Sequence, residues 1–143
     1  INLFISIIKK SNFELAIEKA VELGVSSITP VKANRSQYDI LNKERLQKII
    51  KEATEQSGRV TLPEIRDTLT TKEVISENPE IIIFDMEGES IKNAPKADSI
   101  LIGPEGGWSD EERKMFDKTY SVSKNTLRAE TAVIAGLVSI MLV

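Results

Sequence analysis

A glycine-rich segment carries the clearest chemical signal in the sequence. Leu101-Ile102-Gly103-Pro104-Glu105-Gly106-Gly107 joins the apolar run Ser99–Ile102 to a predicted helix that starts after Ser109. Ligands of open α/β sheets bind at the carboxyl ends of strands, where glycines let the backbone approach a ligand closely. The spacing matches neither the dinucleotide-binding fingerprint nor the Walker loop, so both are excluded. The local pattern alone leaves a ligand-binding turn and a plain strand-to-helix turn open.

The segment Thr126–Ala132 is the second place where chemistry could reside. Arg128, Glu130 and Thr131 lie between a predicted strand, Tyr120–Ser123, and an apolar helix that begins near Thr131. A carboxylate and a hydroxyl there would lie near the partial positive charge at the helix N-terminus. A surface salt bridge together with an N-cap would explain the same residues, so this segment alone does not separate a site from ordinary capping.

A polar stripe is predicted on one face of the helix Lys43–Ser57. Relative to Glu52, the side chains of Glu55, Gln56 and Arg59 follow at offsets of three, four and seven residues, which places them on one stripe. A solvated helix face is the commoner explanation of such a pattern. The stripe therefore identifies no site by itself.

Basic residues at the ends of predicted strands are candidate phosphate contacts. Lys9 and Lys10 follow the first predicted strand, and Arg35 follows the second. The whole chain has a net charge of −3, whereas dedicated nucleic-acid binders usually carry a basic surplus. Binding of RNA would therefore depend on a local basic patch or on a neighbouring domain.

The composition removes several kinds of chemistry. The 143 residues contain no cysteine and no histidine. Disulfides, thiolate metal sites and cysteine nucleophiles are therefore excluded, and the commonest zinc ligand and general base are missing. We expect no metal, and proton transfer at neutral pH must use carboxylates, lysine, tyrosine or solvent.

Apolar runs and helical patterns alternate along the chain. The expected strands are Leu3–Ile8, Ser27–Val31, a short one near Glu64–Arg66, Ile81–Phe84, Ser99–Ile102 and Tyr120–Ser123. The expected helices run from an N-cap at Ser11 to Gly24, over Lys43–Ser57 with Gly58 as the stop, near Thr71–Glu77, from a capping box at Ser109 to about Lys118, and from Thr131 onward. This order predicts an α/β fold with a mostly parallel sheet and helices on both faces, in one domain over residues 1–143.

The ends of the chain carry no recognisable targeting or membrane segment. Lys9 and Lys10 follow the apolar run Ile1–Ile8, whereas the charges of a signal peptide precede its apolar run. The apolar tail Thr131–Val143 is too short to span a bilayer. We therefore expect no membrane contact and a cytoplasmic location. Because the first residue is not Met, we also expect that the chain begins inside a longer protein.

Taken together, these segments resemble the RsmE family, the bacterial 16S ribosomal RNA uridine-N3 methyltransferases of the SPOUT superfamily. The resemblance covers essentially the whole chain in the family's order and spacing, and it departs from the usual pattern at Trp108, Ser123 and Thr126. The matching stretches are Glu18–Val25, Asn34-Arg35-Ser36, Glu52–Arg59, Pro63, Ile102–Gly107, Glu112 and Leu127–Ala132.

The resemblance implies a SPOUT fold with a deep trefoil knot in the C-terminal portion, which spacing alone could not suggest because knots are nearly absent from proteins. It also implies the cofactor S-adenosylmethionine, a homodimer packed through the knot region, small-subunit ribosomal RNA as partner, and an N-terminal RNA-binding barrel domain outside this chain. The implied cofactor-binding residues are Phe84, Ile102, Gly103, Pro104, Glu105, Gly106, Gly107, Leu127, Arg128, Glu130, Thr131 and Ala132.

Uridine N3 is protonated at neutral pH, so its proton must leave before or during methyl transfer. Glu130 or Glu105 is the expected base, and Arg128 is expected to stabilise the developing uracil anion. The expected RNA contacts are Lys10, Arg35 and Arg59, with Glu52 and Gln56 as side chains that would orient the arginines.

Two alternatives stay open. The first is another SPOUT RNA methyltransferase that acts on a ribose 2′-hydroxyl or on tRNA. The second is a non-catalytic RNA-binding or dimerisation module with the same fold, although the Gly103–Gly107 segment argues for retained cofactor binding.

Overall fold

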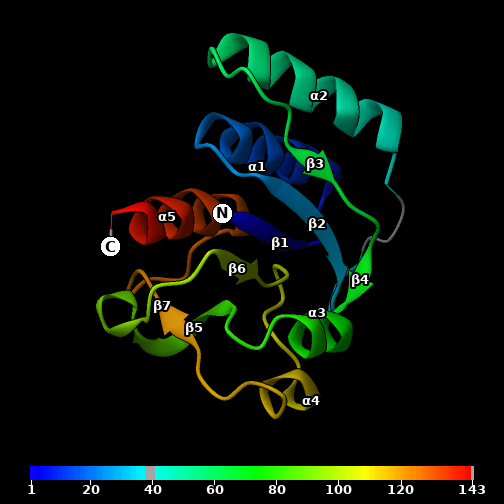
Figure 1. Ribbon diagram of the computed structural model, residues 1–143. Helices are drawn as coiled ribbons and strands as arrows, with labels where there is room; N and C mark the ends of the chain where they lie inside the picture. The colour runs from blue at the N-terminus through cyan, green and yellow to red at the C-terminus, as the bar shows by residue number, and fades with distance from the viewer. Residues whose placement is uncertain (38–40, 143) are drawn as a thin grey trace.

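One parallel sheet forms the centre of the computed structural model, which describes residues 1–37 and 41–142 (Figure 1). Within these ranges the sheet has seven strands in the order β3-β2-β1-β6-β5-β7, and β4 also pairs with β2. Every pair in this sheet is parallel. The strands are β1 (Asn2–Ser6), β2 (Ser27–Lys32), β3 (Glu64–Ile65), β4 (Leu69–Thr70), β5 (Ile82–Ser90), β6 (Ser99–Ile102) and β7 (Tyr120–Ser121).

Alternation of apolar side chains along the central strands fills a core on each face of the sheet. Leu3 and Ile5 of β1 belong to one core, and Phe4 belongs to the other. In β6, Ile100 belongs to the core that contains Leu3, and Leu101 belongs to the core that contains Phe4. Because both faces are buried, the strands appear in the sequence as continuous apolar runs, as expected for a parallel sheet.

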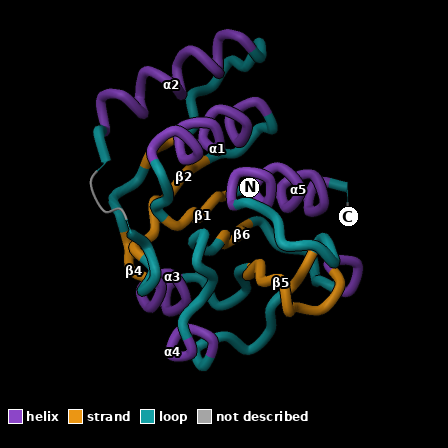
Figure 2. Tube along the Cα trace, turned by 180° about the vertical axis from the view of Figure 1, so that it is seen from behind, coloured by secondary structure: helices purple, strands orange, loops and turns teal. Residues whose placement is uncertain are grey.

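Helices cover both faces, as predicted. α1 (Lys10–Glu22) and α5 (Ala129–Met141) lie side by side on one face, and α2 (Lys43–Gln56) packs outside α1 (Figures 1 and 2). α3 (Thr71–Glu77) contributes Val74 to the core on the other face. The short helix α4 (Asp110–Arg113) and the single 3-10 turn η1 (Ile91–Asn93) lie in the connections around β6.

Most helix ends follow the predicted capping signals. Ser109 forms the predicted capping box with Glu112, and α1 and α2 end before Gly24 and Gly58, whose φ angles of 89° and 71° favour glycine. The predicted N-cap at Ser11 is wrong. α1 begins at Lys10 because the amide of Phe13 already bonds the carbonyl of Lys9 at 2.9 Å.

The two largest errors in predicted length both lie in the C-terminal half. α4 ends at Arg113 instead of continuing to about Lys118. The strand predicted to end at Phe84 continues as β5 to Ser90, and a register shift between Phe84 and Glu89 lets it pair again with β7. Residues 85–90 are mostly exposed, so no apolar pattern marked them as a strand. Val143, the end of the predicted apolar tail, lies outside the described residues.

Gly88 permits the second pairing of β5 with β7. A Cβ atom at this position would lie 2.5 Å from the backbone nitrogen of Tyr120 and 2.6 Å from the carbonyl carbon of Thr119. We therefore expect Gly88→Ala to lower the free energy of unfolding by about 2 kcal/mol, since backbone must shift to relieve the overlap. Urea denaturation followed by circular dichroism measures the change. Glu89→Ala is the control, because it removes only an exposed ion pair with Lys118; equal stability of the two variants would contradict the prediction.

Candidate functional site

The carboxyl ends of β6 and β7, together with Phe84–Met86 within β5, open onto one cleft of about 250 Å³. This is the position at which open parallel sheets bind ligands, and the volume is slightly below the usual range of about 300–1,000 Å³. The cleft is open to solvent, so a ligand can extend beyond it. Its lining is mainly apolar and consists of Phe84, Asp85, Met86, Ile102–Trp108, Arg113, Tyr120–Ser123, Asn125, Thr126, Leu127, Ala129 and Ala132.

The glycine-rich turn, residues Gly103–Gly107, forms one wall of the cleft. It leaves β6 directly and closes through a hydrogen bond from the amide of Gly107 to the carbonyl of Pro104 at 2.9 Å. Gly107 has a φ of 75°, which favours glycine. A Cβ atom on Gly103 would lie 2.8 Å from the ring of Trp108. The conformation of the turn therefore favours glycine at positions 103 and 107.

Trp108 connects the glycine-rich turn to β5. Its indole Nε1 donates to the carbonyl oxygen of Phe84 at 2.9 Å, and its ring meets Phe116 edge-on at a centroid distance of 5.1 Å. The side chain is buried and belongs to the core that contains Phe4 and Leu101. A buried hydrogen bond therefore joins the residue that follows the glycine-rich turn to a lining residue of β5.

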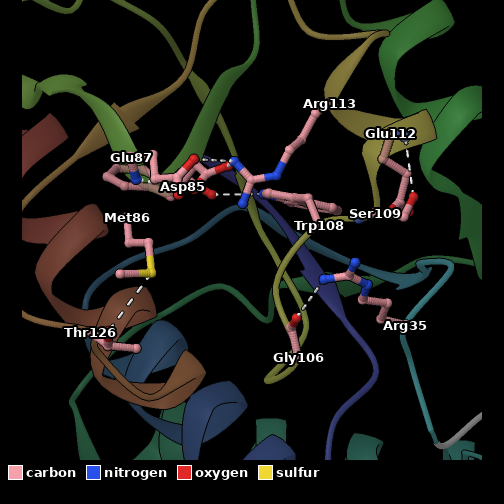
Figure 3. A network of polar contacts seen from close by, with 11 residues as sticks. Arg35, Asp85, Met86, Glu87, Gly106, Trp108, Ser109, Glu112, Arg113 and Thr126 are labelled. Carbon is pink, nitrogen blue, oxygen red and sulfur yellow. Dashed lines mark hydrogen bonds and ion pairs between the residues drawn. The ribbon is translucent and has the colours of Figure 1, made fainter.

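A buried carboxylate lines the cleft from within β5. The side chain of Asp85 is 3% exposed, and its Oδ1 accepts from the amide of Glu87 at 3.1 Å. Its Oδ2 forms an ion pair with Nη1 of Arg113 at 2.6 Å. Arg113 also pairs with the exposed Glu87 at 3.1 Å (Figure 3).

The segment Ser121–Leu127, here the serine loop, forms the opposite wall. Ser121 donates through Oγ to the carbonyl of Ser123 at 2.7 Å, and the Oγ of Ser123 accepts from the amide of Asn125 at 3.0 Å. Thr126 reaches across the cleft and donates to the sulfur of Met86 at 3.7 Å (Figure 3). Within the described residues only glycines have a positive φ, so the backbone at Ser123 is not strained.

The structure brings most of the predicted cofactor residues together. Those that line the cleft are Phe84, Ile102, Gly103, Pro104, Glu105, Gly106, Gly107, Leu127 and Ala132. Glu105 is exposed and accepts a hydrogen bond from Asn12 of α1 at 3.2 Å. Two segments some twenty residues apart in the sequence thus face each other.

Three predicted residues are not part of the lining. Arg128 and Thr131 are exposed at the start of α5, next to the lining residues Leu127 and Ala132. Glu130 is 8% exposed, and its Oε2 has no hydrogen-bond partner among residues 1–37 and 41–142. The roles predicted for these side chains remain predictions.

The predicted RNA contacts differ in their surroundings. Lys10 is exposed at the first residue of α1, and Arg35 is exposed with its Nη1 donating to the carbonyl of Gly106 at 3.1 Å. Arg59 instead donates to the carbonyls of Val21 and Val25 at 2.8 and 2.9 Å. Arg59 therefore holds the end of α1, and an RNA contact would have to use its remaining donors.

Several lining residues were not predicted from the sequence. Asp85 and Met86 directly follow the predicted strand Ile81–Phe84 and were not singled out, and Arg113 gave no signal because α4 is too short to show periodicity. Tyr120–Ser123 was predicted only as a strand, and Trp108, Asn125 and Ala129 were assigned no site role. In the described part of the chain there is no cluster of three or more acidic residues that could hold a metal ion, nor a helix long and apolar enough to cross a bilayer.

Comparison with known proteins identifies the class to which this fold and cleft belong. The family profile described as RNA methyltransferase domain matches residues 1–141. The chain therefore belongs to the RNA methyltransferase domain family.

Individual relatives are similar over almost the whole chain. The ribosomal RNA small subunit methyltransferase E of Rickettsia conorii is 33% identical over 156 residues, which cover 99% of this chain and 64% of the relative. The crystal structure of the enzyme of that name from Neisseria gonorrhoeae, bound to S-adenosylmethionine, superposes with a TM-score of 0.87 at 27% identity and covers 99% of this chain and 65% of that one. The SpoU methyltransferase AviRb of Streptomyces viridochromogenes shares the fold alone, with a TM-score of 0.68 at 17% identity. The chain thus spans about two thirds of the length of the first two.

The hydrogen bond of Trp108 gives a direct test of how the cleft is built. We expect Trp108→Phe to lower the free energy of unfolding by about 1–3 kcal/mol, because the carbonyl of Phe84 would lose its donor in a buried position. Thermal and urea unfolding followed by circular dichroism measures this change. Phe116→Leu, which removes the ring contact and keeps the hydrogen bond, should cost less. A Trp108→Phe protein as stable as the unaltered chain would show that the bond does not hold the cleft.

Proposed function

We propose that this chain is the methyltransferase domain of a ribosomal RNA methyltransferase that uses S-adenosylmethionine and methylates uridine N3 in the small subunit. The observation that carries the proposal is the cleft between the glycine-rich turn and the serine loop, at the carboxyl ends of β6 and β7 and beside β5. The names of the relatives support the substrate, and the length of the relatives supports a further RNA-binding part beyond these residues.

The residues of the cleft fit S-adenosylmethionine. Apolar side chains such as Ile102, Leu127 and Ala132 suit an adenine ring, and the glycines leave backbone accessible. Asp85 and its ion-pair partner Arg113 both line the cleft, so their charged groups are placed to meet polar groups of the ligand. When bound, this cofactor supplies a methyl group on a sulfonium centre, which is a good leaving group.

The chain's own residues would handle the proton and the charge of the substrate. Glu105 is the better placed of the two candidate bases, because its carboxylate lies on the cleft and is exposed, whereas Glu130 is buried outside the lining. Arg128 lies exposed between Leu127 and Ala129, which both line the cleft, so its guanidinium can reach a uracil at the mouth and stabilise the developing anion. Lys10 and Arg35 supply positive charge on the same rim for RNA phosphates.

Replacement of Arg128 tests the proposed chemistry. We expect Arg128→Ala to reduce methyl transfer to unmodified small subunits by at least about 100-fold, because the uracil anion would lose its counter-charge. Incorporation of labelled methyl groups under single-turnover conditions, with the chain in excess, detects even a slow reaction. Lys124→Ala is the control, because it removes an exposed cation close in sequence that does not line the cleft. Wild-type turnover by Arg128→Ala would refute the assignment.

Analysis of the labelled nucleoside separates the candidate reactions. 3-Methyluridine in small-subunit RNA supports the proposal. A ribose 2′-O-methyl product or labelling of tRNA would assign the chain to another reaction of the same superfamily. Absence of transfer, with S-adenosylmethionine also failing to bind, would favour a non-catalytic RNA-binding or dimerisation module.

We also infer that the chain forms a homodimer and carries the C-terminal knot that the family resemblance implies. In support, Ile134, Val138 and Met141 are exposed on one face of α5 at helical spacing, and Leu142 follows them. An apolar stripe of this kind on a terminal helix suits a second copy of the chain across a two-fold axis. After β7, which lies at one edge of the sheet, the chain returns and α5 packs against α1 and β6. This path is consistent with a knot. A ribosomal substrate supports a cytoplasmic location.

A charged residue in the stripe should break this dimer. We expect Val138→Glu to raise the dimer dissociation constant by at least about 100-fold, because an unpaired charge would be buried in the interface. Sedimentation equilibrium over a range of concentrations measures the constant. Leu15→Glu, at an exposed apolar position on α1, is the matched control. An unchanged dissociation constant for Val138→Glu, or an equal rise for Leu15→Glu, would show that the interface lies elsewhere.

A further inference from the structure

Glu112 is a fully buried carboxylate whose hydrogen bonds extend beyond helix capping. It is 0% exposed. Its Oε2 accepts from the amide of Ser109 at 2.9 Å, which is the usual bond of a capping box. Its Oε1 accepts from the amide of Asn34 at 2.9 Å and from the hydroxyl of Thr71 at 2.7 Å. Three uncharged donors, each from a separate segment, thus form hydrogen bonds to one buried carboxylate.

A buried carboxylate with these partners is a rigid junction. Leaving a buried polar group without its hydrogen-bond partner is costly, so the three donors are held to their positions around Glu112. The segments that they hold are the start of α3, the start of α4 and residues Ala33–Ser36, here the Arg35 loop. The junction therefore fixes the exit of β2 relative to the segment that follows the glycine-rich turn.

The Arg35 loop connects the junction at Glu112 to the cleft. The side-chain amide of Asn34 donates to the Oγ of Ser109 at 2.8 Å, and the loop closes on itself through the amide of Ser36 and the carbonyl of Ala33 at 3.0 Å. Arg35, between these two anchored residues, donates to the carbonyl of Gly106 at 3.1 Å (Figure 3). Gly106 lines the cleft.

We propose that Glu112 is a positioning residue for the cleft: it holds the Arg35 loop so that the guanidinium of Arg35 fixes the glycine-rich turn at Gly106. The consequence for ligand binding rests on the proposed function. The mechanical part, that Glu112 orders the glycine-rich turn through Arg35, stands on the contacts of the chain alone.

The chain contains a matched comparison for Glu112. Glu73 forms the capping box of α3 with Thr70, in the same arrangement as Glu112 with Ser109. The hydrogen bonds from the amide and hydroxyl of Thr70 keep the pKa of Glu73 below its usual value, so this carboxylate is ionised at neutral pH. Glu73 is exposed, and within residues 1–37 and 41–142 its carboxylate accepts hydrogen bonds only from Thr70. Glu73→Gln therefore removes a capping carboxylate without touching the Arg35 loop.

A double-mutant cycle on the binding of S-adenosylmethionine tests the proposal. We expect Glu112→Gln and Arg35→Ala each to weaken binding by about five-fold, the usual effect of one lost hydrogen bond, and the double variant to weaken it by about the same five-fold. Glu73→Gln should change binding by less than about two-fold. Calorimetric titration at pH 7.5 measures the dissociation constant of S-adenosylmethionine for the unaltered chain and for these four variants. A double variant weakened by about 25-fold, or a Glu112→Gln protein that binds normally, would overturn the proposal.

Amide hydrogen exchange tests the same claim without ligand. In Glu112→Gln we expect faster exchange in residues 33–36 and in residues 103–107, and in Arg35→Ala only in residues 103–107. Unchanged exchange in residues 103–107 of Glu112→Gln would refute the positioning role. If Glu112→Gln does not fold, Asn34→Ala removes the parallel bond to Ser109, and faster exchange in both segments is again required. A chain that fails to bind S-adenosylmethionine but shows this exchange pattern would refute the proposed function and leave the positioning role established.

Discussion

The parallel pairing of β5 with both β6 and β7 is the constraint on which the cleft depends. It brings Phe84 of β5 level with the carboxyl ends of β6 and β7, so the loops that leave those two strands meet beside the middle of β5. Gly88 allows β5 to approach the backbone at Thr119 closely enough to pair a second time, and the hydrogen bond from Trp108 to Phe84 fixes the glycine-rich turn against β5. Chemistry-bearing residues from separate segments are thereby collected without a thiol or imidazole side chain among them.

Two of the buried carboxylates among the described residues, Glu112 and Asp85, have different surroundings near this edge. Glu112 accepts hydrogen bonds from uncharged donors of three segments, which suits a structural junction. Asp85 lines the cleft, and Arg113 balances its charge through an ion pair. A carboxylate enclosed by donors of the chain stabilises the fold, whereas an ion pair on the lining of a cleft can also contact a ligand.

The sequence predicted the architecture better than the details of the site. Continuous apolar runs such as Ser99–Ile102 identified the buried parallel strands, and the capping box at Ser109 marked a helix start correctly. The extension of β5 to Ser90 was not predictable from the sequence, because its outer residues are exposed and its pairing depends on a close backbone approach at Gly88. Likewise, nothing in the sequence distinguishes Arg59, which bonds carbonyls at the end of α1, from a cation available to RNA. Asp85 and Arg113 meet only through the tertiary fold, so local patterns could not pair them.

The central claim is that the glycine-rich turn and the serine loop form one binding site for S-adenosylmethionine. The most direct measurement is a titration of the isotope-labelled chain with S-adenosylmethionine, followed by amide chemical shifts. We predict saturable shifts confined to Phe84–Met86, Ile102–Trp108 and Ser121–Ala132, accompanied by a change in the fluorescence of Trp108, the single tryptophan. Absence of saturable shifts, or shifts centred instead on the groove between α1 and α2, would contradict the claim.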